Sequence, residues 1–278
     1  LKTIKKVCAE YLLLGNIDNT SQTFIKNLES LEPGTLLKVN FSQNILKTEK
    51  KKYWSPKIND NNLDLEEAKK KVRKNFLENI KYHLRSDVPI AIFLSGGIDS
   101  SAIACAIRYL DKNIEINAFS FLSDDEYSEE KWIDLVNKSV NLKTLNLVKI
   151  EKITLSELDK IIINQDIPFL EMSIIAEYIL FKEAKKKGFK VILQGQGGDE
   201  VLGGYLGYPG FKLRDMLKKN KYFEIINFYK NWSKNFKKNY LQLTMRLFST
   251  FLSSEKNYFF LKFIDKDKSP NWVNDKKL

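Results

Sequence analysis

The chain has 278 residues, and 43% of them are hydrophobic, which is enough to build a substantial globular core. Lysine and arginine exceed aspartate and glutamate by 46 − 35 = 11, but the basic residues are scattered, which favours a solvated surface over a nucleic-acid footprint. The apolar runs are too short to span a bilayer, so we expect no membrane partner. Two cysteines without a CxxC pair, and one histidine, indicate no zinc site and a reduced, cytoplasmic setting.

The opening segment predicts a helix, because its apolar residues share helical spacing: Val7, Tyr11, Leu12 and Leu14. A Pro-Gly turn and an alternating strand follow in "LEPGTLLKVNF". We interpret the polar stretch "EKKKYWSPK" as a connector and expect a domain boundary near residues 50–62. A long helix is predicted next, with Asp64 as its N-cap and Glu67 as the capping-box partner.

Apolar runs then alternate with helical patterns. The strand candidates are "VPIAIFL", "INAFSF", "TLNLVKI" and "FKVILQ", and the helix candidates between them include "SSAIACAIRYL", "EEKWIDLVNKSV" and "SIIAEYILFKEAKKKG". This alternation is typical of the α/β class, with a parallel sheet covered by helices on both faces. Beyond Gly210 the chain is rich in aromatic residues and lysine, which predicts a helical core packed with aromatics in preference to a base-stacking surface.

Two glycine-rich segments follow strands, and in parallel sheets ligands bind at the carboxyl ends of strands. In "FLSGGIDSS" a strand ends in Ser95-Gly96-Gly97 and a helix begins near Ser100, so free backbone N–H groups and the helix dipole converge on one anion site. The hydroxyls of Ser95, Ser100 and Ser101 can donate further hydrogen bonds. Asp99 beside phosphates implies Mg²⁺ between them. A plain strand-to-helix turn with Asp99 as a cap explains the same residues and stays open.

The second segment, "GQGGDEVLGG", is not a dinucleotide fingerprint, because Glu200 occupies the position of the last glycine. The first segment is not a Walker A loop, since no G-K-[ST] follows it. Asp199 and Glu200 follow the glycines of this segment, and capping at the start of a helix is one reading of this pair.

These segments carry a resemblance to a known family. "SGGIDSS" resembles the pyrophosphate-binding loop of the ATP pyrophosphatase enzymes, and together with "LQGQGGDEVLGGY" it resembles the synthetase domain of glutamine-dependent asparagine synthetases. "DIPFLEMSIIAEYIL" is similar to a helical segment of that family. The resemblance implies a remnant of an α+β glutaminase domain of the N-terminal nucleophile type, plus linker, over residues 1–55. It implies an ATP-binding domain of the adenine-nucleotide alpha-hydrolase type over residues 56–278.

The resemblance also implies a carbon-nitrogen ligase. ATP would activate the side-chain carboxylate of aspartate as an acyl-adenylate, and glutamine-derived ammonia would displace AMP, with ATP and Mg²⁺ as cofactors and a homodimer as a compatible assembly. The implied pyrophosphate contacts are Ser95, Gly96, Gly97, Asp99, Ser100 and Ser101. The implied adenosine contacts are Phe93, Phe121, Gln194 and Gly195. The implied Mg²⁺ ligands, and the residues that would carry catalysis, are Asp99 and Asp199.

The sequence departs from the family pattern at several points. Gln196 stands where many members have glutamate, and an amide hydrogen-bonds but is no general base at neutral pH. Phe121 and Leu122 replace a small residue plus glycine, which changes the expected adenine pocket. The N-terminal cysteine nucleophile, an "E-x-R-x-P-F-L-D"-like segment and a lysine for the α-phosphate are not found, so we expect a fragment of a longer protein.

Three other functions stay open from the sequence. The chain can be an amidotransferase or cyclase relative that adenylates a different carboxylate. It can bind ATP without completing catalysis. A basic RNA-binding module rests on net charge alone, and would show steeply salt-dependent binding.

Overall fold

The computed structural model describes residues 2–15, 20–42, 45–57, 63–122, 129–149, 153–169, 171, 173–236, 240–252 and 260. The chain forms two compact units, residues 1–194 and residues 195–278, and each is described by itself. Among the described helices none is both long enough and apolar enough to cross a membrane.

The first unit opens with helix α1 (Lys5–Leu14), where the opening segment predicted one. An antiparallel hairpin follows, made of β1 (Thr35–Ser42) and β2 (Ile45–Lys52), with Thr35 opposite Lys52. The predicted polar connector was therefore partly wrong, because residues 49–52 belong to a strand. Lysines hide the alternation of β2, since a solvent-facing strand has no need of apolar residues at every second position.

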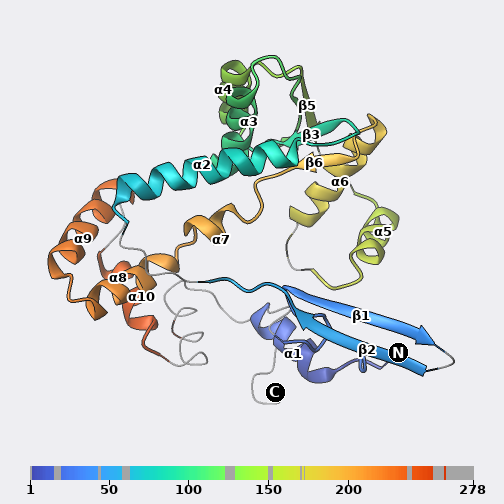
Figure 1. Ribbon diagram of the computed structural model, residues 1–278, viewed down its shortest axis with the longest axis horizontal. Coiled ribbons are helices and arrows are strands. Elements are labelled where there is room, and N and C mark those ends of the chain that lie inside the picture. Colours follow the sequence, from blue (N-terminus) through green and yellow to red (C-terminus); the bar gives the residue numbers. More distant parts are fainter. Residues whose placement is uncertain are drawn as a thin grey trace. The chain divides into compact units, whose positions relative to one another are not determined.

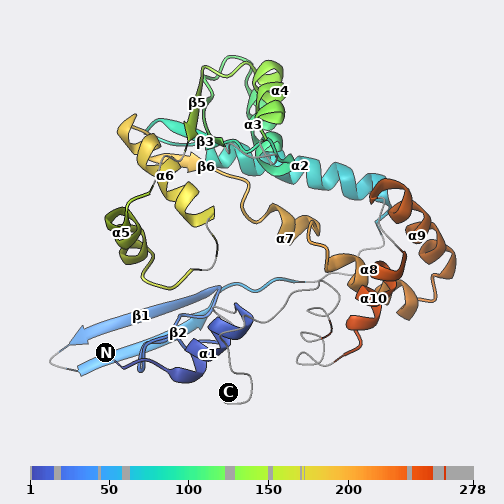
Figure 2. The ribbon, with the colours of Figure 1, turned by 180° about the vertical axis from the view of Figure 1, so that it is seen from behind.

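A four-stranded parallel sheet and its helices make up the rest of the first unit (Figures 1 and 2). The strands are β3 (Ile90–Phe93), β4 (Asn117–Leu122), β5 (Thr144–Lys149) and β6 (Val191–Leu193). The helices are α2 (Leu65–His83), α3 (Ile98–Leu110), α4 (Glu130–Val140), α5 (Leu155–Gln165) and α6 (Ser173–Lys186). The strand order is β5-β4-β3-β6, which confirms the predicted α/β class.

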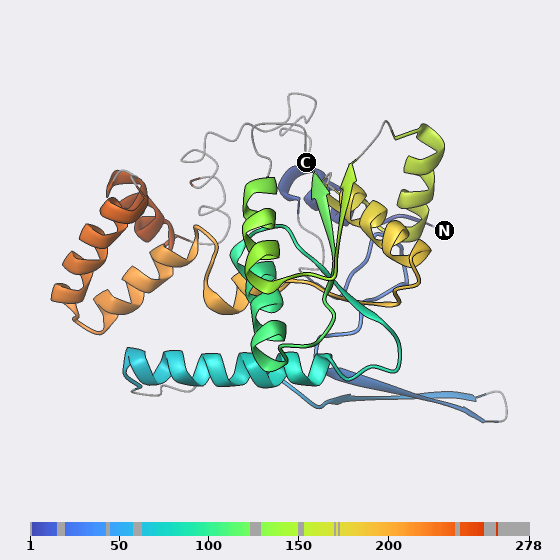
Figure 3. The same cartoon turned by 90° about the horizontal axis from the view of Figure 1, so that it is seen from above.

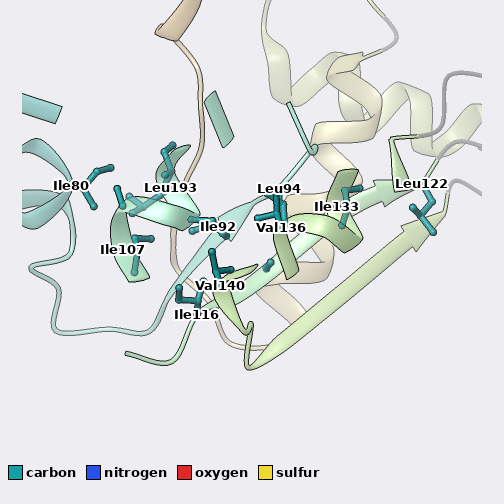
Figure 4. Packing of buried hydrophobic residues seen from close by; sticks show 14 residues of the cluster. Ile80, Ile92, Leu94, Ile107, Ile116, Leu122, Ile133, Val136, Val140 and Leu193 are labelled. Atoms are coloured by element: carbon teal, nitrogen blue, oxygen red, sulfur yellow. The ribbon is translucent and has the colours of Figure 1, made fainter. Parts of the chain in front are cut away.

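The sheet is covered on both faces, as the alternation predicted (Figure 3 shows the green helices α3 and α4 on one side of the strands and the yellow α6 on the other). On the first face, strand residues such as Ile92 and Leu122 pack with α2, α3 and α4 (Figure 4). On the second face, Phe93 and Phe119 pack with Leu180 of α6. Phe119 has no exposed surface, and full burial of such a side chain stabilises the fold by about 1.5–3 kcal/mol.

Helices α2 and α5 each begin at a residue whose side chain caps the helix. The Asp64 side chain accepts a hydrogen bond from the Glu67 backbone N–H at 2.8 Å, which confirms the predicted N-cap of α2. Helix α5 was missed from the sequence, although Thr154 and Glu157 form a complete capping box at its first turn. That signal was present in the letters "TLSE" and could have found the helix.

The second unit is helical, as predicted for the aromatic segment (Figure 2). Its helices are α7 (Gly198–Leu202), α8 (Tyr208–Lys218), α9 (Tyr222–Phe236) and α10 (Tyr240–Ser249). Trp232 is buried with Leu213, Met216 and Leu243 in the core of α8, α9 and α10. Of the other aromatic residues in this segment, Phe248 is half exposed, and Phe259 lies outside the described residues.

Candidate functional site

Most of the predicted site residues gather at one edge of the sheet in the first unit. Strands β3 and β6 are parallel neighbours, with Ile92 opposite Leu193. The chain leaves β3 through α3 toward β4 on one side, and reaches β6 on the other side only later. The direction of the connections therefore reverses between β3 and β6, and the crevice outside such a reversal is where open α/β sheets bind ligands. The turn at Ser95–Gly97 and the residue Gln194 follow these two strands directly.

Gly96 gives the first turn a shape that other residues would resist. Its φ is +83°, in the left-handed region, and a Cβ atom there would lie 2.8 Å from the Cβ of Trp132 and 3.1 Å from the backbone nitrogen of Ile133. The first turn of α4 thus packs directly on the glycine. This long-range contact fixes the backbone path between β3 and α3.

The serines of the turn bind one another. The Ser100 hydroxyl accepts from the Ser95 N–H at 3.2 Å, donates to the Gly97 carbonyl at 3.3 Å and lies 3.1 Å from the Ser95 hydroxyl. The Ser95 hydroxyl also accepts from the Gly97 N–H at 3.2 Å. Ser100 is only 7% exposed, so its hydroxyl shapes the turn. The buried Ser101 hydroxyl finds no hydrogen-bond partner among the described residues.

Asp99 lies in the first turn of α3 and is not its cap. The N-cap is Gly97, which makes no side-chain capping bond, so the alternative reading of Asp99 as a capping residue was wrong. Within the described residues the Asp99 carboxylate has no hydrogen bond and no ion pair. The first backbone N–H groups of a helix also lack intrahelical partners and carry a partial positive charge. Asp99 therefore leaves a free anionic group beside an anion-attracting helix start.

The two phenylalanines assigned to adenosine contacts turn their rings into the core. Phe93 is buried, and its ring lies 4.8 Å from the ring of Phe181, centroid to centroid. Phe121 is partly buried against the same cluster. Any contact with a nucleotide at the sheet edge would therefore use their backbone atoms. Gln194 is partly exposed directly after β6.

Gly195 and Asp199 belong to the second unit and lie in its first turn and helix. Gly197 is the N-cap of α7 with φ +87°, and no side chain caps this helix, so capping does not explain the Asp199-Glu200 pair either. The Asp199 carboxylate lies against the backbone of Gly204, where an added Cβ atom would overlap its Oδ1 atom. The backbone N–H of Gly204 also donates to the Asp199 carbonyl at 3.0 Å.

Glu200 is held by two tyrosines that follow α7. The Tyr205 hydroxyl donates to the Glu200 carboxylate at 2.7 Å, and the Tyr208 hydroxyl donates to the Glu200 backbone carbonyl at 3.2 Å. The two tyrosine rings stack with centroids 6.1 Å apart. The hydrogen bond with Tyr205 lowers the pKa of Glu200, and the same bond raises the pKa of Tyr205 to about 12.

The Asp99 carboxylate has the chemistry to hold a cation together with substrate phosphates. In the described part of the chain no three His, Cys, Asp or Glu side chains form a metal cluster. Mg²⁺ in nucleotide sites needs only one or two protein carboxylates, because phosphates and water complete its shell. Asp99 offers such a carboxylate, since it has no other partner among the described residues.

Sequence reasoning missed three residues of this region. Trp132 packs on Gly96, and nothing in the sequence pointed to that contact. Gly204 and Tyr205 belong to the motif "LQGQGGDEVLGGY", but the motif alone did not predict their contacts with Asp199 and Glu200.

Comparisons with known proteins point to one family. The family model described as asparagine synthase matches residues 71–272. An amidase from Penicillium rubens is 30% identical over 203 residues, which cover 66% of this chain and 30% of that protein. A glutamine-hydrolysing asparagine synthetase from Bacillus subtilis is 29% identical over 204 residues, which cover 72% of this chain and 31% of that protein. The chain thus spans less than a third of the length of these relatives.

Among solved structures, an NH3-dependent NAD synthetase from Campylobacter jejuni is similar at 17% identity and a TM-score of 0.34, covering 76% of this chain and all of that chain. The assignment of the fold therefore rests on the strand order and register given above, and not on this similarity. The family model covers most of the chain, including both glycine turns. The chain is a member of the asparagine synthase family.

Proposed function

We propose that the protein is an ATP-dependent amide-forming ligase that adenylates a carboxylate, with aspartate as the first candidate, and passes the acyl group to ammonia. Membership of the asparagine synthase family supports the general reaction. The observation that carries the proposal is the pairing of β3 with β6. It brings the carboxyl ends of two strands together, and each strand is followed directly by a glycine-rich turn with an acidic residue behind it.

The first turn would bind the pyrophosphate part of ATP. Backbone N–H groups of Ser95–Gly97 and the start of α3 would donate to phosphate oxygens, joined by the unpartnered Ser101 hydroxyl. The backbone of Phe93 and Phe121 would contact adenosine on one side, and Gln194 with Gly195 on the other. Asp99 and Asp199 would hold Mg²⁺, whose charge offsets that of pyrophosphate when it is bound.

The proposed reaction has two steps, adenylation of the acid and formation of the amide. A carboxylate oxygen of the acid attacks the α-phosphorus of ATP, so the acyl-phosphate bond forms while the bond to pyrophosphate breaks. The nitrogen of ammonia then attacks the acyl carbon, the C–N bond forms, AMP leaves, and the nitrogen loses a proton. Gln196 can orient ammonia by hydrogen bonds, but the proton has to go to AMP, water or another base, because an amide does not take it.

Release of pyrophosphate tests the proposal. The full chain is incubated with Mg²⁺, ATP and one candidate acid at a time, and pyrophosphate and AMP are measured. Aspartate-dependent release is expected. Release with another acid but not with aspartate would reject aspartate as the substrate, and ATP binding without AMP formation for any acid would favour the binding-only alternative.

Asp99→Ala tests the role of the first turn independently of the acyl substrate. We expect this variant to lose Mg²⁺-dependent ATP binding, measured by isothermal titration calorimetry. Unchanged affinity would contradict the proposed role of the turn.

A different carboxylate is the second candidate, and two observations favour it. Gln196 replaces the glutamate common in the family, and a relative named as an amidase matches this chain as well as the asparagine synthetases do. The panel of acids used above separates the two candidates.

A further inference from the structure

Asp199 and Glu200 are adjacent carboxylates, and the proposed function needs only one of them at the cation. We propose that Glu200 is a positioning residue that Tyr205 braces, and that of these two residues only Asp199 faces the cation. This inference rests on the proposed function and assigns different roles to Asp199 and Glu200 in the second glycine-rich turn.

The brace is made of contacts within residues 200–208. Tyr205 donates to the Glu200 carboxylate at 2.7 Å, a short bond to a charged acceptor. Tyr208 donates to the carbonyl of the same residue at 3.2 Å and stacks on Tyr205. Glu200 is thus tied at its side chain and at its backbone, and its carboxylate is already occupied.

Asp199 is in the opposite state. No hydrogen bond or ion pair to its carboxylate is found in the described part of the chain. Its Oδ1 atom is set against the backbone of Gly204, at a place that a methyl group would fill. Gly204 precedes Tyr205, so the residue that seats the Asp199 carboxylate adjoins the residue that holds Glu200.

A brace has a physical reason here. Helix α7 has only 5 residues, and a helix of that length is unstable without outside contacts. The bonds from Tyr205 and Tyr208 close the chain back onto α7, so the helix and the bend at Gly203 and Gly204 keep one geometry. Loss of the Tyr205 hydroxyl would therefore let Asp199 sample orientations in which its carboxylate no longer meets the cation.

The test compares four single variants of the full chain by calorimetric titration with ATP over a series of Mg²⁺ concentrations. The quantity measured is the Mg²⁺ concentration that gives half of the maximal ATP binding. Asp199→Asn removes the proposed ligand, and a rise of about tenfold or more is expected, as for loss of one charged ligand. Tyr205→Phe removes only the brace, and a rise of about fivefold is expected from one lost hydrogen bond to a charged group.

Glu200→Gln separates positioning from ligation. The amide oxygen still accepts from Tyr205, so the half-saturating Mg²⁺ concentration should stay within about twofold of the parent. Tyr222→Phe is the matched control, because it deletes a similarly exposed hydroxyl that donates to the Asn220 side chain, and it should change nothing. If Tyr205→Phe does not fold, the comparison of Glu200→Gln with Asp199→Asn still tests which of the two carboxylates binds the cation.

The possible results separate this inference from the proposed function. If the parent chain binds no ATP in the presence of Mg²⁺, both the proposed function and the assignment of Asp199 and Glu200 are contradicted. If the parent binds but Glu200→Gln raises the Mg²⁺ requirement as much as Asp199→Asn, Glu200 is a ligand and only this inference is overturned. A Tyr205→Phe variant that matches Tyr222→Phe would overturn it as well.

Discussion

The two glycine turns look alike in sequence and are held in different ways. Each has a left-handed glycine, Gly96 or Gly197, followed by a helix with an aspartate at its second position. Gly96 is enclosed by the first turn of α4, whereas no described atom lies within 4 Å of a Cβ atom added to Gly197. The first turn is held by packing against α4, and the second depends on the residues that come directly after it.

This difference teaches that a shared motif does not imply a shared source of rigidity. The first turn is fixed by residues distant in sequence, such as Trp132, and by the buried hydroxyl of Ser100. The second turn is fixed locally, through Gly204 and Tyr205. Substitution of Gly96 in the first turn should therefore damage the fold, whereas substitution of Gly204 beside the second should leave the fold intact and damage the proposed site.

The largest effect is expected for Gly96→Ala. The left-handed φ costs about 1–2 kcal/mol for a residue with Cβ, and overlap with the Trp132 and Ile133 backbone region adds about 1–3 kcal/mol. The free energy of unfolding should fall by about 3 kcal/mol, measured by urea denaturation. Gly197→Ala is the matched control, and it should cost about 1 kcal/mol from φ alone. Equal losses in the two variants would show that the packing on Gly96 adds no rigidity.

A smaller and different effect is expected for Gly204→Ala. The added methyl group would meet the Asp199 Oδ1 and Cγ atoms, which can rotate away, so stability should change by less than about 1 kcal/mol. The rotated carboxylate would miss the cation, and Mg²⁺-dependent ATP binding should weaken about tenfold. Calorimetric titration and urea denaturation of the same sample check both halves. Normal ATP binding in this variant would argue against a role for the Asp199 orientation.

The smallest effect concerns pH. The pKa of Tyr205 is raised to about 12, so the stabilisation from its bond to Glu200 is fully present below the ordinary tyrosine pKa of 10.0 and is lost as pH rises through about 12. The lowered pKa of Glu200 means that its part is present above 4.5 and is lost as pH falls. An alkaline absorbance titration of the parent minus that of Tyr205→Phe should show one phenol with a midpoint near 12. A midpoint near 10 in that difference would contradict the bond.

Much of the fold could be predicted because its signals are local. Apolar runs that alternate with helical spacing predicted the parallel sheet, and Asp64 marked the start of α2. Strand β2 was missed because its lysines obscure the period, and α5 was missed although its capping box was legible. The domain boundary near residues 50–62 stays a prediction.

The candidate site was predictable in its residue types and less so in its arrangement. The sequence placed Ser95–Gly97 and Asp99 at a strand end, and the strand order bears out that position. It did not reveal that Ser100 would be committed to the turn, nor that Trp132 would cover Gly96, because such contacts join segments that are distant in the chain. The roles of Asp99 and Asp199 at a cation stay proposals.

The seat of Trp132 on the first turn has a practical consequence. The indole is 53% exposed, and Lys131 stacks on it with its amino nitrogen 5.5 Å from the ring centroid. The Cβ atom of this residue lies next to Gly96, and indole emission responds to nearby charge and solvent, so the side chain can report optically on the turn. Nucleotide binding at the turn, as proposed above, can be tested in the unlabelled chain by intrinsic fluorescence, with Trp132→Phe as the reference.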